Sequence, residues 1–208
     1  MTRMHSPSCD NNQAPILAVL VDALADCQHV LEIGSGTGQH SVFFAPRLPH
    51  LIWQTSELAQ HHDSIAAWHA DYPAPNLRAP LALEIGRNPW PVAAHAGQAA
   101  HTEPVVDAVF TSNTLHIMAW PHAQQLLQMV GQNLPAGGVF VVYGPFNYGG
   151  AFTSESNRHF DAWLKARDAH SGIRDYEAVV QAAQQHGLYV LHDHAMPANN
   201  RTLVFQKR

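Results

Sequence analysis

The 208-residue chain has few cationic side chains. Nine arginines and two lysines, Lys165 and Lys207, stand against 16 acidic residues, so the formal net charge is −5 with the histidines neutral. Proteins that bind nucleic acid usually present a basic face, which this composition does not favour. Because neither lysine follows a glycine, the Gly-Lys pair of a phosphate-binding P-loop is absent.

Cysteines and long apolar runs are also scarce. Cys9 and Cys27 have no metal-site spacing, which argues against a disulfide scaffold and a thiolate metal site, and a reduced cytoplasm is the expected location. The longest apolar run, Ala14–Ala25, contains Asp22 and is too short to span a bilayer. We expect it to form a leading amphipathic helix after an irregular segment, residues 1–13.

Histidine is the one abundant ionisable residue, with 16 copies. Full protonation would move the formal charge from −5 to −5 + 16 = +11, which raises the hypotheses of a metal site and of a pH switch. His192 and His194 share a strand face but lack a third ligand, so we expect no metal.

Short continuous apolar runs alternate with helical stretches along the chain. Such runs are typical of parallel strands buried on both faces, which predicts one α/β domain over residues 1–208 with a doubly wound sheet. The expected strands are Val30–Ile33, Leu51–Gln54, Leu81–Ile85, Val105–Phe110, Val139–Tyr143, Leu188–Leu191 and Thr202–Phe205. The expected helices are Gln39–Arg47, Glu57–Ala70, Trp120–Asn133, Ser156–Asp168 and Asp175–His186, and Arg87–Pro104 is a doubtful crossover.

The loop Met196–Asn200 is too short to hold a crossover helix. The last strand is therefore expected to run antiparallel. This topology carries Asn199 and Asn200 to the carboxyl edge of the sheet, where open α/β sheets bind ligands.

Three glycines, Gly34, Gly36 and Gly38, follow the first expected strand. A dinucleotide fingerprint starting at Gly34 would need glycine or alanine at position 39, which is Gln39, and no tyrosine has the lysine four residues on that a short-chain dehydrogenase requires. The pattern from Glu32 to Gly38 instead resembles motif I of class I S-adenosylmethionine-dependent methyltransferases. That resemblance implies that Glu32 supports the methionine part of the cofactor and that the loop, with Ser35, wraps its carboxypropyl chain. The alternative is a glycine turn that only joins a strand to a helix.

Two further acids follow strands at positions suited to a nucleoside. Glu57, beside Leu58, lies 23 residues after Gly34, close to the offset at which a carboxylate accepts hydrogen bonds from ribose hydroxyls. The alternative places Glu57 in the first turn of a helix capped by Ser56. Glu84 and Ile85 end the third expected strand, where related methyltransferases hold the adenine.

Motifs along almost the whole chain resemble methyltransferase-like protein 26, a bacterial and animal family whose substrate is not established. These motifs are Asn12-x-x-Pro15-Ile-Leu, Ser112-Asn113-Thr-Leu-His116-Ile, Tyr143-Gly-Pro-Phe146-Asn147, Ser154-Glu-Ser-Asn157, Gly172-Ile-Arg174-Asp175 and Met196-Pro-Ala-Asn199-Asn200. The resemblance implies a seven-stranded Rossmann-like sheet of order 3-2-1-4-5-7-6. The family has aspartates where this chain has Glu57 and Glu84. The longer glutamate side chains keep the negative charge but place the carboxylate further from the backbone.

The loops after the fourth and fifth strands and before the last one should converge beside the cofactor's methyl group. We expect His116, Tyr143 and Asn113 to be catalytic, with Asn113 also near the cofactor. His116 is the candidate general base because its ordinary pKa is near 6.5, although it could instead pack under the following helix. The expected substrate-binding residues are Asn12, Phe146, Asn147, Asn199 and Asn200.

Three functions remain open. The first is an S-adenosylmethionine-dependent methyltransferase acting on a small molecule, the second a catalytically silent, cofactor-binding regulatory protein, and the third a nucleic-acid methyltransferase. Arg158 and Arg174 could meet an anionic substrate, although Arg174 could equally pair with Asp175. Ser154 is expected to cap the helix that follows it.

Overall fold

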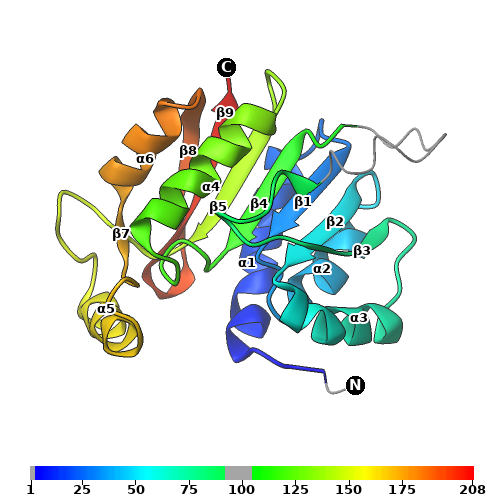
Figure 1. Cartoon of the computed structure of the whole chain (residues 1–208), viewed down its shortest axis with the longest axis horizontal. Helices are drawn as coiled ribbons and strands as arrows, with labels where there is room; N and C mark the ends of the chain where they lie inside the picture. The colour runs from blue at the N-terminus through cyan, green and yellow to red at the C-terminus, as the bar shows by residue number, and fades with distance from the viewer. Residues whose placement is uncertain (1–2, 92–104) are drawn as a thin grey trace. The chain divides into compact units, whose positions relative to one another are not determined.

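The computed structural model describes residues 3–91 and 105–208 and contains a seven-stranded sheet (Figure 1). The hydrogen-bonded strand order is β3-β2-β1-β4-β5-β9-β8, which confirms the predicted doubly wound α/β methyltransferase topology. The strands are β1 (His29–Ile33), β2 (Ile52–Glu57), β3 (Leu77–Ala82), β4 (Ala108–Ser112), β5 (Val139–Gly144), β8 (Leu188–Met196) and β9 (Asn200–Lys207). The chain divides into two compact units, which we call unit 1 (through Thr111) and unit 2 (from Ser112) and describe separately.

The described residues of unit 1 form parallel strands and the helices α1 (Pro7–Ala23), α2 (Gln39–Phe44) and α3 (His62–Asp71). Every residue of β1 is buried, as the continuous apolar run predicted. The rings of Phe44, Trp53 and Phe110 lie 5.4–6.0 Å apart between centroids and are fully buried. Because Phe44 belongs to α2, this aromatic core fixes that helix, and the glycine loop before it, to the sheet.

The predicted boundaries of the leading helix and of the third strand in unit 1 are wrong. The leading helix starts at Pro7 rather than Ala14, because a proline fits the first turn of a helix and the mostly polar residues that follow it give no apolar pattern. The third strand ends at Ala82, so Glu84 and Ile85 follow it in a turn instead of ending it. Pro80 is tolerated within β3 because this strand is at the edge of the sheet.

The helix expected from Glu57 also begins later. Glu57 is the last residue of β2, and a short 3-10 turn (Ala59–His61) precedes α3. Ser56 is not a helix cap, since its hydroxyl donates to the carbonyl of Glu32 at 2.7 Å. The alternative in which Glu57 only charges the first turn of a helix is therefore wrong.

Unit 2 contains helices α4 (Trp120–Asn133), α5 (Glu155–Arg167) and α6 (Tyr176–Gln184), and a parallel pair of two-residue strands, β6 (Phe146–Asn147) and β7 (Arg174–Asp175). Strand β9 runs antiparallel to β5 and β8, which confirms the inference from the short connecting loop. Ser154 caps α5, because its Oγ accepts the N–H of Asn157 at 3.1 Å.

The expectations about a membrane span, the cysteines, the doubtful crossover and a metal site can also be compared with the described residues. No described helix is long and apolar enough to cross a membrane. Cys9 and Cys27 are free thiols. Most of the expected crossover Arg87–Pro104 lies outside the described residues. Within residues 3–91 and 105–208, no three His, Cys, Asp or Glu side chains are grouped as a metal site would require.

Candidate functional site

The three glycines after β1 all have the left-handed backbone conformation that favours glycine, with φ values of 74° at Gly34, 57° at Gly36 and 96° at Gly38. A Cβ atom at Gly38 would lie 2.9 Å from the Cα of Ile65 in α3, so this glycine permits close packing. A Cβ atom at Gly36 would meet nothing within 4 Å. Gly36 therefore borders open space, where a ligand can approach the backbone.

Glu57 lies beside this open position. Its Oε2 accepts the N–H of Gly36 and its Oε1 accepts the N–H of Leu58, both at 2.8 Å. An ionised carboxylate has about four lone-pair sites. These two bonds thus leave capacity for two hydroxyl donors, and they hold the carboxylate at the glycine loop, while its predicted contact with ribose stays a prediction.

Glu32 is buried under the same loop, with Oε2 accepting the indole N–H of Trp53 at 2.9 Å. Burial raises the pKa of Glu32 to about 7. The hydrogen bonds from Trp53 and Ser35 lower this pKa and oppose part of the shift, whereas the negative charge of Glu57 raises it further. Two carboxylates at one loop favour a cationic ligand. Sequence reasoning missed Trp53, since a tryptophan in a buried strand is usually a core residue.

The raised pKa of Glu32 predicts pH-dependent binding of a cationic ligand. Below pH 7 most of the Glu32 carboxyl is protonated and loses its attraction for a cation. For a ligand whose amino group stays protonated, we expect the affinity to fall roughly tenfold from pH 7.0 to 5.5, and S-adenosylmethionine is a suitable probe. Fluorescence titrations at both pH values test this, and Glu32→Gln should bind weakly with little pH dependence. An equally pH-dependent Glu32→Gln variant would contradict the assignment.

Glu84 has a different environment from Glu57. Its carboxylate pairs with Arg87 at 3.0 Å, and its backbone N–H donates to Oδ1 of Asn88 at 2.7 Å. Ile85 beside it is half-buried. The structure therefore places the pair in a local turn after β3, and their predicted contact with adenine stays a prediction.

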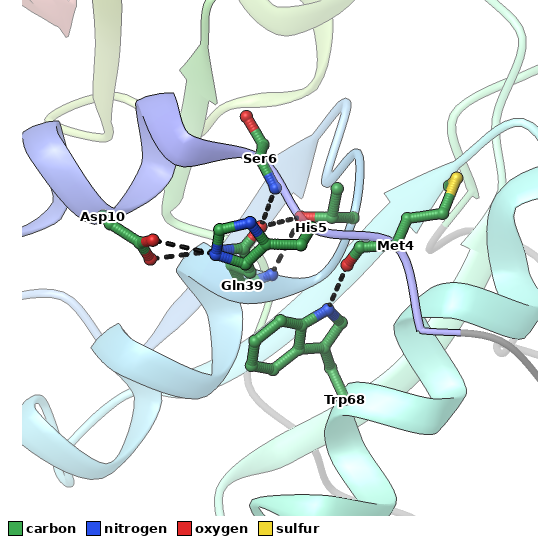
Figure 2. Close-up of polar contacts among 7 residues, drawn as sticks. Met4, His5, Ser6, Asp10, Gln39 and Trp68 are labelled. Carbon is green, nitrogen blue, oxygen red and sulfur yellow. Dashed lines mark hydrogen bonds and ion pairs between the residues drawn. The ribbon is translucent and has the colours of Figure 1, made fainter.

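The amino-terminal segment is bound to the start of α2 and to α3 (Figure 2). The N–H of Ser6 donates to Oε1 of Gln39, whose Nε2 donates to Oδ1 of Asp10 at 3.1 Å. The indole of Trp68 donates to the carbonyl of Met4 at 2.8 Å. Gln39, which argued against a dinucleotide site in the sequence, thus anchors the residues before α1.

Asn12 is buried in α1, and its Oδ1 accepts the Nε2–H of His40 at 2.7 Å. Burial lowers the pKa of His40 to about 4, so this imidazole is neutral at pH 7. The structure therefore places Asn12 against the first turn of α2, next to the glycine loop.

In unit 2, Asn113 and His116 are brought together at the end of β5. The backbone N–H of Asn113, which has φ 57°, donates to the carbonyl of Tyr143 at 2.9 Å. A Cβ atom at Gly144 would lie 3.7 Å from Nδ1 of His116 and 4.0 Å from Oδ1 of Asn113. Gly144 thus leaves room beside both polar side chains.

His116 is buried and its ring makes an edge contact with Phe160, with the centroids 5.3 Å apart. Burial lowers the pKa of His116 to about 4, and the positive charge of Arg174 contributes. The imidazole is therefore neutral at pH 7 and free to accept a proton, although a low pKa weakens a general base.

The remaining predicted residues divide into two groups. Tyr143, Phe146 and Asn147 are buried, and Oδ1 of Asn147 has no hydrogen-bond partner among the described residues. Asn199 and Asn200 hold the β8–β9 turn: the Asn199 carbonyl accepts from Asn157 at 3.1 Å, and the Asn200 amide donates to the Pro197 carbonyl at 3.2 Å. Only the first group leaves a buried polar atom for a ligand.

The arginines proposed for an anionic substrate have other partners. Arg158 pairs with Glu155 on the same helix. Arg174 donates to the backbone carbonyls of Leu115, Met118 and His170. The predicted ion pair of Arg174 with Asp175 is therefore wrong, since its guanidinium is engaged by the backbone, and its role toward an anionic substrate stays a prediction.

Comparisons with known proteins agree with this fold. Residues 3–207 match the model of a family described as "Protein of unknown function (DUF938)". An O-methyltransferase family protein from Burkholderia thailandensis is 16% identical, with TM-score 0.74, over 96% of this chain and 57% of that one. An O-methyltransferase family 2 protein from Planctomyces limnophilus, in complex with apigenin, is 15% identical with TM-score 0.78 over 97% and 60%.

Human N-acetylserotonin methyltransferase, solved with S-adenosylmethionine, is 11% identical with TM-score 0.76, covering 96% of this chain and 52% of that one. This chain thus spans little more than half the length of these three proteins. At such low identity the likeness establishes the fold.

Proposed function

Because the chain belongs to the DUF938 family and has a methyltransferase fold, we propose that it is an S-adenosylmethionine-dependent methyltransferase acting on a small molecule. The motif resemblance to methyltransferase-like protein 26 supports the same proposal. Several structurally similar proteins were solved with S-adenosylmethionine or its demethylated product.

The observation that carries the proposal is the glycine loop with its two carboxylates. The open side of Gly36 accommodates a ligand, Glu57 can accept ribose hydroxyls, and Glu32 offers negative charge to an ammonium or sulfonium group. The donor set therefore fits the cofactor, with Gly34, Ser35, Gly38 and Leu58 completing the loop. When bound, S-adenosylmethionine supplies a methyl group activated by a sulfonium centre.

His116, Asn113 and Tyr143 are the proposed catalytic residues of unit 2. A neutral His116 imidazole can take the proton that a hydroxyl nucleophile loses, and the Asn113 side chain can orient the acceptor. Asn147 offers a buried acceptor oxygen to an O–H or N–H group of the substrate. Alignment of nucleophile and methyl carbon then contributes several kcal/mol to lowering the barrier.

The charge distribution favours an acceptor without a carboxylate or phosphate. Each of the eleven Lys and Arg side chains has an ion-pair, carbonyl or aromatic partner within the chain. An anionic substrate would therefore share its cation with a partner that is already in contact with that cation. Together with the O-methyltransferase neighbours, this supports methylation of a neutral hydroxyl compound.

Transfer of a labelled methyl group tests the proposal. The native chain should label neutral hydroxyl acceptors such as catechol more than their carboxylated analogues, and more than RNA. His116→Ala with Tyr143→Phe should lose this activity, whereas His122→Ala, which alters an exposed histidine of α4, should keep it. Cofactor binding without any transfer would contradict the proposal and favour a catalytically silent regulatory protein.

A further inference from the structure

Four consecutive backbone carbonyls after β4 accept hydrogen bonds from one short segment of unit 2. The carbonyl of Leu115 accepts from Nε of Arg174 at 3.0 Å, and that of Met118 accepts from the same guanidinium. The carbonyl of His116 accepts the N–H of Gly172 at 2.9 Å. The carbonyl of Ile117 accepts the hydroxyl of Ser171, also at 2.9 Å. Residues 115–118 are therefore held by residues 171–174 along their whole length.

This arrangement matters because residues 113–119 lie between β4 and α4, outside regular secondary structure. Carbonyls in such a loop normally bind water and leave the loop free to move. Here protein donors replace water on each carbonyl from Leu115 to Met118. These hydrogen bonds hold the backbone that carries His116, in place of the hydrogen bonds that a helix or a strand would provide.

The donor segment is itself anchored at two places. The N–H of Ile173 donates to Oδ1 of Asp161, a buried residue of α5 whose other oxygen pairs with Lys165 at 2.7 Å. Arg174 pairs with Phe146 in the β6–β7 ladder. The segment thus links α5, the residues after β5 and the His116 loop.

Arg174 is suited to this task by the shape of its side chain. A guanidinium has five donors in a rigid plane, and here it reaches the carbonyl of His170 at 3.0 Å as well as those of Leu115 and Met118. A lysine would keep the charge but could not hold three carbonyls in this fixed geometry.

We propose that residues 171–174, which we call the carbonyl clamp, position the His116 imidazole for methyl transfer, with Arg174 as the principal positioning residue. The assignment of a catalytic task to His116 rests on the proposed function, whereas the clamp itself is a property of unit 2. Burial is the larger cause of the low pKa of His116, and the positive charge of Arg174 lowers that pKa in the same direction.

The clamp can be tested without turnover. Histidine ring resonances of the full chain would be followed by NMR from pH 3.5 to 8, with His116 assigned from the His116→Asn spectrum. In Arg174→Ala we expect the pKa of His116 to rise above about 4 but to stay below its ordinary value, because burial remains, and the amides of residues 113–118 to exchange faster. Arg174→Lys should change exchange more than the pKa, and Ser171→Ala should increase exchange around Ile117. Arg158→Ala, which removes an exposed arginine of α5, is the matched control.

Unchanged exchange and an unchanged His116 pKa in both Arg174→Ala and Ser171→Ala would overturn the clamp. S-adenosylhomocysteine binding, measured on the same samples, reports separately on the proposed function. We expect the clamp variants to bind it within about twofold of the native chain while turnover falls about 10- to 100-fold, as misplaced catalytic groups do. A loss of turnover from Arg158→Ala equal to that from Arg174→Ala would also contradict the clamp.

Discussion

Gly36→Val is expected to weaken binding of S-adenosylhomocysteine about 100-fold, a loss of about 2.7 kcal/mol. The valine side chain would enter the open space beside Gly36, where the structure has no heavy atom within 4 Å of a built Cβ. It would also strain the backbone at φ 57° and so disturb the bond from the Gly36 N–H to Glu57. Isothermal titration calorimetry measures the change in affinity.

In Gly36→Val, the effect of backbone strain must be distinguished from the effect of blocking the ligand site. Gly137→Val is the matched control, because Gly137 also has a left-handed φ, 85°, and open space around its built Cβ. Both variants should lose about 1–2 kcal/mol of unfolding free energy through this strain, but only Gly36→Val should lose binding. Equal losses of affinity in the two variants would show that Gly36 has no special place in the site.

Glu57→Ala is the second substitution with a large expected effect. It removes the acceptor of the Gly36 and Leu58 amides and the proposed acceptor of the ribose hydroxyls, and hydrogen bonds to a charged group contribute about 1.5–3 kcal/mol each. For Glu57→Ala we expect the affinity for S-adenosylhomocysteine to be about 100-fold weaker than that of the native chain. Glu57→Gln should have an intermediate affinity, because its amide oxygen restores one acceptor only. The same calorimetric titration provides the measurement.

Unit 2 offers a matched control for Glu57. Glu177 accepts the backbone N–H of Gly149 at 3.0 Å, so Glu177→Ala also removes a carboxylate from a loop glycine. Its affinity for S-adenosylhomocysteine should stay within about twofold of the native value, which is the usual range for a change outside a binding site. A Glu57→Ala variant that binds like Glu177→Ala would eliminate the ribose role.

The parallel sheet and its antiparallel last strand were predictable because local patterns indicate them, whereas the strand order followed from the family resemblance. Continuous apolar runs indicated parallel buried strands, and the short loop before the last strand required an antiparallel return. Glu57 was predictable for the same reason, since the end of a parallel strand next to β1 lies at the edge that carries the glycine loop. The structure adds its hydrogen bond to Gly36, which spacing alone does not specify.

The wrong predictions involve contacts between distant residues. The polar first turns of α1 lack an apolar pattern, and they are held by partners such as Gln39, more than 25 residues away. The end of β3 depends on pairing with β2 rather than on the apolar run that suggested Leu81–Ile85. Arg174 next to Asp175 suggests an ion pair in the sequence, but the fold brings carbonyls more than 50 residues away to its guanidinium.

The central claim is that the loop Gly34–Gly38, with Glu32 and Glu57, binds S-adenosylmethionine. The most direct measurement is a calorimetric titration of the native chain with S-adenosylhomocysteine at pH 7.5, with S-adenosylmethionine and NAD as competitors. The account predicts saturable binding with one ligand per chain, displaced by S-adenosylmethionine and not by NAD. An absence of binding, or displacement by NAD, would contradict it.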